Sequence, residues 1–171
     1  MRNVRQQGFS LIELLIVVAI IGIIAAIAIP NLLASRRAAN EGSAQSSLRT
    51  VYSCQLVYRA TAGDGNYGDL AALMANDLIG AELGGGSKSG YTFTATPDNT
   101  LTIPTFFVSA VPRNTAAFSR TGNRSFTVAE DGMLRARVSD VGPANHAAAI
   151  DSATWAPVGR HGQIGRGDRV I

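Results

Sequence analysis

The sequence predicts an α+β fold in which one long N-terminal helix packs against a C-terminal antiparallel sheet. Two observations predict this class. An apolar run at residues 9–29 continues into an amphipathic stretch at residues 30–60, so the two form a single helix. Beyond it, residues 61–171 contain runs of alternating apolar and polar residues separated by turn-forming residues. These runs indicate strands that follow one another in a globular domain.

Residues 9–29 have the length and composition of a membrane span. Among these 21 residues only Ser10 and Glu13 are polar. At about 1.5 Å per residue the helix reaches ~31 Å, close to the thickness of one hydrocarbon core. A carboxylate inside a bilayer costs roughly 2.5–3.5 kcal/mol on insertion scales, so Glu13 is expected to have a partner.

Three interpretations fit a basic start followed by an apolar run. An ordinary secretory signal would end at an A-x-A site at residues 26–28, but its apolar region would not contain a charge such as Glu13. A plain single-pass anchor leaves Glu13 without an explanation. In a prepilin-type leader the first eight residues stay in the cytoplasm, a protease cuts after Gly8, and the apolar segment is retained.

Residues 1–34 resemble the type IV pilins and the related pseudopilins of type II secretion. The shared features are Gly8 at the cleavage position, Phe9 as the new N-terminus, Glu13 at the fifth mature position and Pro30 closing the span. The resemblance implies a leader at residues 1–8 that a prepilin peptidase removes. It also implies that the same enzyme N-methylates Phe9.

The resemblance also implies a partner for Glu13. In a filament of staggered helices, the Glu13 carboxylate of one subunit meets the Phe9 α-amine of its neighbour. Each charge alone in lipid is costly, whereas the pair compensates both, so we expect it to fix the axial register of the subunits. Gly22 and Pro30 are the positions at which we expect the helix to stretch during assembly.

The function implied is that of a structural subunit and not of an enzyme. The subunit would form a type IV pilus for adhesion, motility or DNA uptake, with a periplasmic pseudopilus of type II secretion as the alternative. A secreted monomeric binding domain is a third possibility. The implied partners are other copies of the chain, prepilin peptidase, an inner-membrane assembly platform with its ATPase, and membrane lipid before assembly.

The implied location is the bacterial inner membrane, with the C-terminus outside the cytoplasm, and then the filament. Charge alone does not orient the span, because Arg2 and Arg5 precede it and Arg36 and Arg37 follow it. The chain carries 15 basic and 12 acidic residues, and loss of Arg2 and Arg5 would reduce the formal charge from +3 to +1. Such a balance does not indicate a nucleic-acid-binding protein, although DNA contact stays open.

The second part of the helix, residues 31–60, is predicted to turn one face to the domain. The inward residues at helical spacing are Leu48, Val51, Tyr52 and Leu56. The residues expected on the wetter face are Arg36, Arg37, Glu41, Gln45 and Arg49. Pro30 should kink this helix without necessarily ending it.

Short elements are predicted beyond the long helix. A helix at residues 69–75 has Asp69 as its N-cap and Leu70, Leu73 and Met74 facing inward. The glycines at residues 84–86 form a break. Strands follow at residues 91–95, 101–109, 125–128 and 133–138, with turns at residues 97–99 and 130–132. Pro104 should interrupt its strand or lie at an edge.

The C-terminal region, residues 139–171, has no periodic pattern and is predicted to be an irregular surface segment that Trp155 anchors to the sheet. Its basic residues are Arg160, His161, Arg166 and Arg169, which we expect to be solvated. The stretches at residues 90–93 and 121–126 look like a recurring pattern of the pilin family.

No cofactor or metal site is predicted. His146 and His161 have no Cys or carboxylate neighbours at zinc-ligand spacing. Residues 64–69 only faintly resemble a calcium loop, because the EF-hand glycine position holds Asp69. Cys54 is the only cysteine, so no intrachain disulfide can form, and it is expected to behave as a small buried hydrophobe. Tyr52, Tyr58 and Tyr67 are expected to be core or interface aromatics.

Overall fold

The computed structural model describes residues 9–116 and 119–159. The predicted leader, including Gly8, lies outside the described residues, as do the basic side chains predicted at residues 160–169. The described chain divides into two compact units, the first ending at Arg36 and the second beginning at Arg37.

The predicted long helix is confirmed. Helix α1 (Leu11–Ala60) has 50 residues. Its first part makes up the described first unit apart from Phe9 and Ser10, and its second part begins the second unit. It begins two residues later than predicted, with the Leu14 N–H bonded to the Ser10 carbonyl at 3.2 Å. Pro30 lies inside the helix without ending it. Proline costs one backbone hydrogen bond there, and the turns on both sides are long enough to continue without it.

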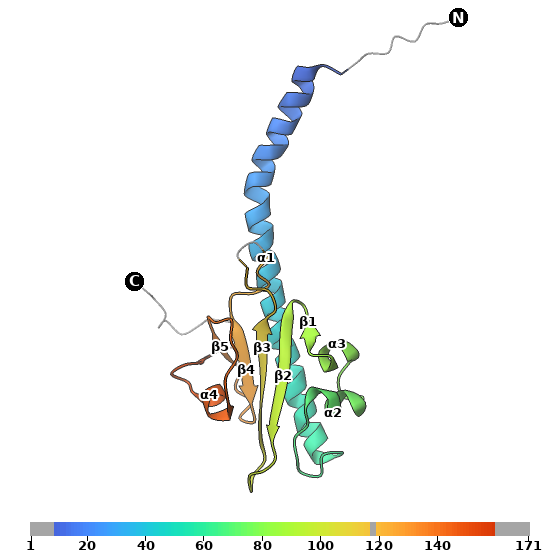
Figure 1. Cartoon of the computed structure of the whole chain (residues 1–171), viewed down its shortest axis with the longest axis vertical. Helices are drawn as coiled ribbons and strands as arrows, with labels where there is room; N and C mark the ends of the chain where they lie inside the picture. Colours follow the sequence, from blue (N-terminus) through green and yellow to red (C-terminus); the bar gives the residue numbers. More distant parts are fainter. Residues whose placement is uncertain (1–8, 117–118, 160–171) are drawn as a thin grey trace, which may run out of the picture. The chain divides into compact units, whose positions relative to one another are not determined.

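The second unit contains a six-stranded antiparallel sheet in which each strand pairs with the next along the chain (Figure 1). The strands are β1 (Ser87–Lys88), β2 (Tyr91–Asp98), β3 (Thr105–Pro112), β4 (Ser125–Ala129), β5 (Arg135–Arg137) and β6 (Ala156–Pro157). The short helices are α2 (Leu70–Ala75), α3 (Ala81–Gly84) and α4 (His146–Ile150). The predicted α+β class is therefore confirmed.

One core lies between α1 and the sheet. From α1, Ala44, Leu48 and Val51 are fully buried and meet the inward side chains of the central strands. The inward side chains of β2, β3 and β4 are Tyr91, Phe93, Ala95, Phe106, Val108, Ala110, Phe126 and Val128. They occupy every second position because successive side chains of a strand point to opposite faces, and in β2 the alternate positions are threonines.

The buried face of α1 differs from the prediction at three positions. Leu56 is 43% exposed, whereas Gln55 is fully buried and Glu41 is also buried. Gln55 is tolerated there because its amide forms a reciprocal pair of hydrogen bonds with the backbone of Gly68. Placing Glu41 on the wetter face was wrong, because it lies on the same stripe as Ala44 and Leu48.

The turn predicted at residues 97–99 was placed too early in the sequence. The strand predicted to begin at residue 101 was also placed too early, because β3 begins at Thr105. Pro97 and Asp98 end β2, and Pro97 pairs with Phe106 of β3. A proline is accommodated because β1 pairs only with the start of β2, which leaves an edge beside Pro97. Leu101 and Ile103, predicted in a strand, are exposed loop residues that precede Pro104.

The predicted hairpin between β4 and β5 is confirmed. Gly132 has a φ of +70°, and its N–H bonds to the Ala129 carbonyl at 2.9 Å. A Cβ at this position would lie 2.9 Å from the ring of Tyr52, so glycine satisfies both the turn and the close approach of α1. β5 is shorter than predicted and spans only Arg135–Arg137.

The shorter elements were predicted less completely. Asp69 caps α2 as predicted, accepting from the Ala72 N–H at 2.7 Å, but Met74 is exposed. The elements α3, β1, α4 and β6 were missed because each has only two to five residues and shows no period. The region after residue 139 is thus partly ordered into elements. Trp155 immediately precedes β6 and is buried, as predicted.

Candidate assembly site

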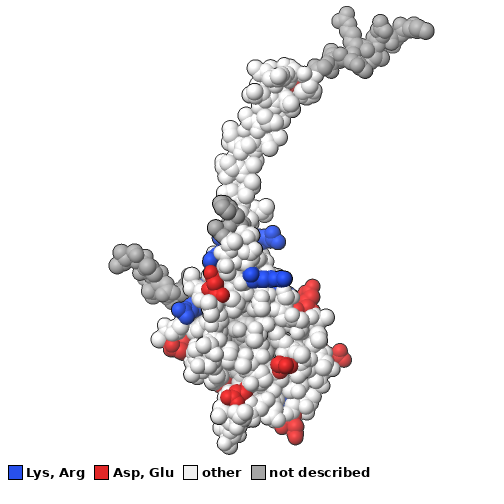
Figure 2. Space-filling model, viewed as in Figure 1, with Lys and Arg blue, Asp and Glu red and all other residues white. Residues whose placement is uncertain are grey.

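The N-terminal part of α1 presents an uncovered apolar surface. Phe9 is 77% exposed, and the large apolar side chains from Leu11 to Ile29 are exposed in the described residues. The helix is long and apolar enough to cross a membrane, and none of its most apolar 18-residue window is buried. Figure 2 shows this stretch almost free of charged side chains. A surface of this kind needs lipid or other helices to cover it.

Glu13 lies in the first turn of α1 and is exposed. No ion pair within the described part of the chain involves it. A carboxylate near the N-terminus of a helix is favoured by the helix dipole, but this effect is modest, about 0.3–1 kcal/mol. Phe9 and Glu13 therefore lie four residues apart at the start of the described chain, and no described residue forms an ion pair with Glu13.

Gly22 and Pro30 both lie inside α1. A Cβ added at Gly22 would meet no atom within 4 Å, so packing inside the subunit does not require a glycine there. Beyond Pro30, the Asn31 side chain donates to the Ile27 carbonyl at 3.1 Å and the Ser35 hydroxyl donates to the Asn31 carbonyl at 3.0 Å. Both positions are weak for a helix by residue type.

A buried ion pair connects α1 with the segment before β4. The Glu41 carboxylate accepts from Arg124 Nη2 at 2.7 Å and Nε at 2.8 Å, and from the Asn123 N–H at 2.8 Å. Sequence analysis missed this site because Glu41 was assigned to solvent. Its spacing of three and seven residues before Ala44 and Leu48 was the available signal.

The two stretches that resemble a pilin-family pattern, residues 90–93 and 121–126, come together in the structure. The Tyr91 hydroxyl donates to the Arg124 carbonyl at 2.8 Å, and burial raises the pKa of Tyr91 well above its usual range, so it remains a donor. Gly122 is needed because a Cβ there would overlap the Tyr91 hydroxyl. From α1, the Asn40 side chain donates to the Thr121 carbonyl at 2.9 Å.

Metal-binding and redox chemistry have no visible site in the described chain. No group of three or more His, Cys, Asp or Glu side chains could hold a metal ion there. His146 instead lies 2.8 Å from the Glu130 carboxylate. The Cys54 thiol is half-buried and donates to the Leu78 carbonyl at 3.1 Å, and burial raises its pKa, which disfavours the reactive thiolate. Tyr52 and Tyr67 pack against Phe106, in line with the predicted core role.

Comparison with known proteins agrees with this arrangement. A family model described as the prokaryotic N-terminal methylation motif matches residues 3–29. The chain is 34% identical over 99 residues to the type IV narrow pilus major component PilA5 of Thermus thermophilus, and the match covers 58% of this chain and 78% of that protein. The chain belongs to the type IV pilin family.

Two further pilins are similar over shorter stretches. The type IV major pilin protein PilA of Myxococcus xanthus is 39% identical over 93 residues, and the type IV wide pilus major component PilA4 of Thermus thermophilus is 51% identical over 59 residues. These matches cover 54% and 34% of this pilin, but only 39% and 44% of the two relatives. No solved structure matches significantly.

Proposed function

We propose that this pilin is the structural subunit of a type IV pilus, serving adhesion, motility or DNA uptake, and that it has no enzymatic role. The observation that supports this most strongly is the uncovered apolar helix at residues 9–29, with one carboxylate near its start. Lipid covers such a surface before assembly, and the helices of neighbouring subunits cover it in a filament. The three similar proteins are pilus components by name, which favours a pilus over a type II secretion pseudopilus.

Processing precedes assembly in this proposal. Prepilin peptidase cuts after Gly8 and methylates the new amine of Phe9, while residues 9–29 hold the chain in the inner membrane with its C-terminus outside the cytoplasm. The helix at residues 30–60 and the domain at residues 61–171 follow on the outside. An assembly platform and its ATPase then move the subunit from lipid into the filament.

Assembly provides the partner that Glu13 lacks among the described residues of the subunit. The Phe9 amine of a neighbouring subunit carries the opposite charge and lies at the end of an equally apolar helix. A carboxylate and an amine that meet between packed helices compensate each other's desolvation, whereas either one left alone is costly. The apolar helix contacts supply the bulk of the adhesion, and the charge pair selects the axial register.

The test is the variant Glu13→Gln, which removes the charge and preserves the side-chain volume. We expect a mature, N-methylated Phe9 in the membrane fraction by mass spectrometry, together with at least a tenfold loss of filaments sheared from cells. Glu82→Gln is the matched control, because Glu82 is an exposed glutamate in the first turn of α3. It should leave filament yield unchanged.

Three outcomes would count against this proposal. A normal filament yield from Glu13→Gln would show that assembly does not need the charge pair. A mature N-terminus near Ile29 would place the chain among secreted domains that carry an ordinary signal peptide. Short periplasmic filaments that depend on an outer-membrane secretin would favour the pseudopilus.

A further inference from the structure

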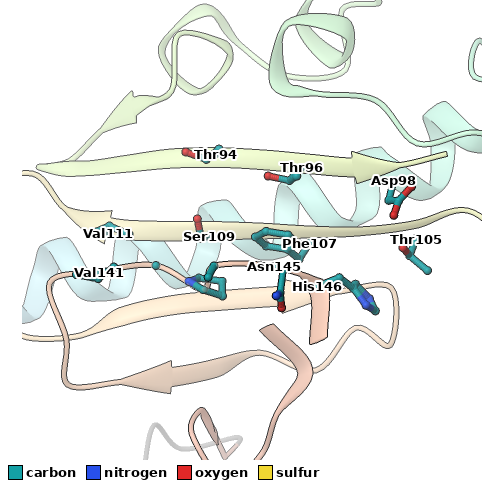
Figure 3. A pocket seen from close by; sticks show the side chains of 13 residues that line it. Thr94, Thr96, Asp98, Thr105, Phe107, Ser109, Val111, Val141, Asn145 and His146 are labelled. Carbon is teal, nitrogen blue, oxygen red and sulfur yellow. The ribbon is translucent and has the colours of Figure 1, made fainter. Parts of the chain in front are cut away.

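The sheet face that points away from α1 carries a groove of about 580 Å³ (Figure 3). Strands β2 and β3 form its floor, and residues 141–146 form one wall. On the side of β4, Phe107 and Ala129 hold α4 through Ala149. The volume lies within the roughly 300–1,000 Å³ typical of sites for small molecules.

Hydroxyl groups dominate the floor. Thr94 and Thr96 of β2 are exposed on this face. The alternate residues of the strand, Phe93 and Ala95, point to the opposite face and are buried in the core. Thr105 and Ser109 of β3 add two more hydroxyls to the lining. The Thr105 oxygen itself is buried and has no hydrogen-bond partner in the described part of the chain.

The two ends of the groove differ in polarity. Val111 and Val141 lie at one end, and Asp98, Thr105 and His146 lie at the other (Figure 3). Hydrogen bonds from the Thr100 hydroxyl and N–H hold the pKa of Asp98 below its usual range, so this carboxylate is ionised at neutral pH.

The wall depends on a glycine. A Cβ added at Gly142 would stand 3.3 Å from both the Ser109 hydroxyl oxygen and a methyl carbon of Val111. The absence of a side chain therefore lets the wall approach the floor and define a narrow groove rather than an open sheet surface.

The lining selects among chemical classes of ligand. Among the described residues it contains the Asp98 carboxylate and no lysine or arginine, and its histidine, His146, already lies against the Glu130 carboxylate, so a phosphate, a nucleic acid or an acidic sugar would meet a negative charge without a free cation. A purely apolar ligand would leave the hydroxyls of Thr94, Thr96 and Ser109 without water or a hydrogen-bond partner. The class that remains is neutral, rich in hydroxyls that both donate and accept, and apolar on its ring faces.

We infer that this groove binds a neutral saccharide segment of about two or three sugar units. The sugar hydroxyls bond to the floor hydroxyls, Asp98 and Asn145, and an apolar ring face packs on Val111 and Val141. The groove lies entirely within the second unit, so this binding goes beyond the proposed function and does not require a filament.

The experiment uses the purified full-length pilin in micelles of a zwitterionic detergent, because detergents with sugar headgroups would compete. The probes are the neutral trisaccharides maltotriose, cellotriose and triacetylchitotriose, with the acidic sialyllactose for comparison. Titrations followed by saturation-transfer NMR yield the dissociation constants. We expect at least one neutral trisaccharide to bind, and sialyllactose to bind at least tenfold more weakly.

The double variant Thr94→Val, Thr96→Val removes two hydroxyls but retains β-branched side chains. We expect it to weaken binding roughly 30-fold, as for two lost neutral hydrogen bonds. The matched control is Thr92→Val, on the same face of β2 but outside the groove, which should change binding less than twofold. Thr96→Ser retains the hydroxyl and should bind like the unsubstituted chain, which separates lost contacts from lost folding.

The inference is overturned if none of the neutral trisaccharides binds, if sialyllactose binds equally well, or if Thr92→Val weakens binding as much as the double variant. Self-association that the double variant abolishes, in the absence of saccharide binding, would assign the groove to a subunit interface instead. Each of these results is independent of filament yield, so failure here leaves the proposed pilus function standing.

Discussion

Glu41 and Asn40 are adjacent on α1, and both hold the segment that leads into β4. Asn40 binds the Thr121 carbonyl, and Glu41 binds Asn123 and Arg124 with both carboxylate oxygens. Desolvation offsets much of the attraction in such an ion pair, so it contributes more to the position of this segment than to net stability. Removing only one partner should lower the stability, because the other charge then stays buried without compensation.

Glu41→Gln should therefore lower the free energy of unfolding by about 2 kcal/mol, less than the roughly 3–5 kcal/mol of fully buried pairs, because the Arg124 side chain keeps some contact with water. Urea titration of the full chain in micelles measures this change. Trp155 is a suitable probe, since it is the only tryptophan and is buried.

The control for Glu41→Gln is Asp140→Asn, which breaks the more exposed pair with Arg120. It should change the free energy of unfolding by no more than about 0.5 kcal/mol. Equal effects of the two variants would mean that the burial of Glu41 has no energetic consequence.

Helix α1 serves two environments with one continuous backbone. Its first part is apolar all round and is uncovered in the first unit, while from Glu41 onward only one stripe is buried against the sheet. Within the first unit, Pro30 removes one backbone hydrogen bond of α1, and Gly22 costs about 1 kcal/mol relative to alanine. These are the positions at which a helix under axial load should first lose hydrogen bonds.

The double variant Gly22→Ala, Pro30→Ala should stiffen α1 without a steric conflict in the described part of the subunit, because a Cβ added at Gly22 would meet nothing within 4 Å beyond the adjacent backbone of its own helix. We expect higher helix content by circular dichroism in micelles and smaller extension of single filaments at a given force in optical tweezers. Ala25→Ser, inside the same apolar stretch, is the control for substitution as such. If filaments of the double variant extend as far as unsubstituted filaments at the same force, neither residue contributes to stretching.

The whole molecule was predictable where a pattern extends over many residues. The apolar run of α1 and the amphipathic stretch that follows it together extend over 50 residues, and Asp131 with Gly132 marks the β4–β5 hairpin locally. The burial of Glu41 was not predictable in this way, because it depends on Arg124, 83 residues away. The groove was missed for the same reason: in the sequence Thr94 and Thr96 are only the polar half of a strand, and the other wall of the groove comes from residues 141–146, more than 40 residues later.

At the scale of the filament, each subunit offers two different charges to two different neighbours. In the proposed filament its Glu13 would meet the Phe9 amine of one neighbour, and its own Phe9 amine would meet the Glu13 of another, so the contact would be heterologous and need not close. A Glu13→Gln subunit among unsubstituted ones therefore breaks one pair and leaves the other intact. The loss should be partial rather than complete.

Co-expression of both forms tests this arrangement. We expect Glu13→Gln subunits to enter filaments, but at a share clearly below their share in the membrane, because each one leaves a neighbour's amine desolvated without its carboxylate. Mass spectrometry of the N-terminal peptide in sheared filaments and in membranes gives the two shares, and co-expressed Glu82→Gln should show equal shares. Equal shares for Glu13→Gln would mean that the amine finds compensation elsewhere. Complete exclusion would instead indicate that Glu13 acts before polymerisation, when the subunit is taken from the membrane.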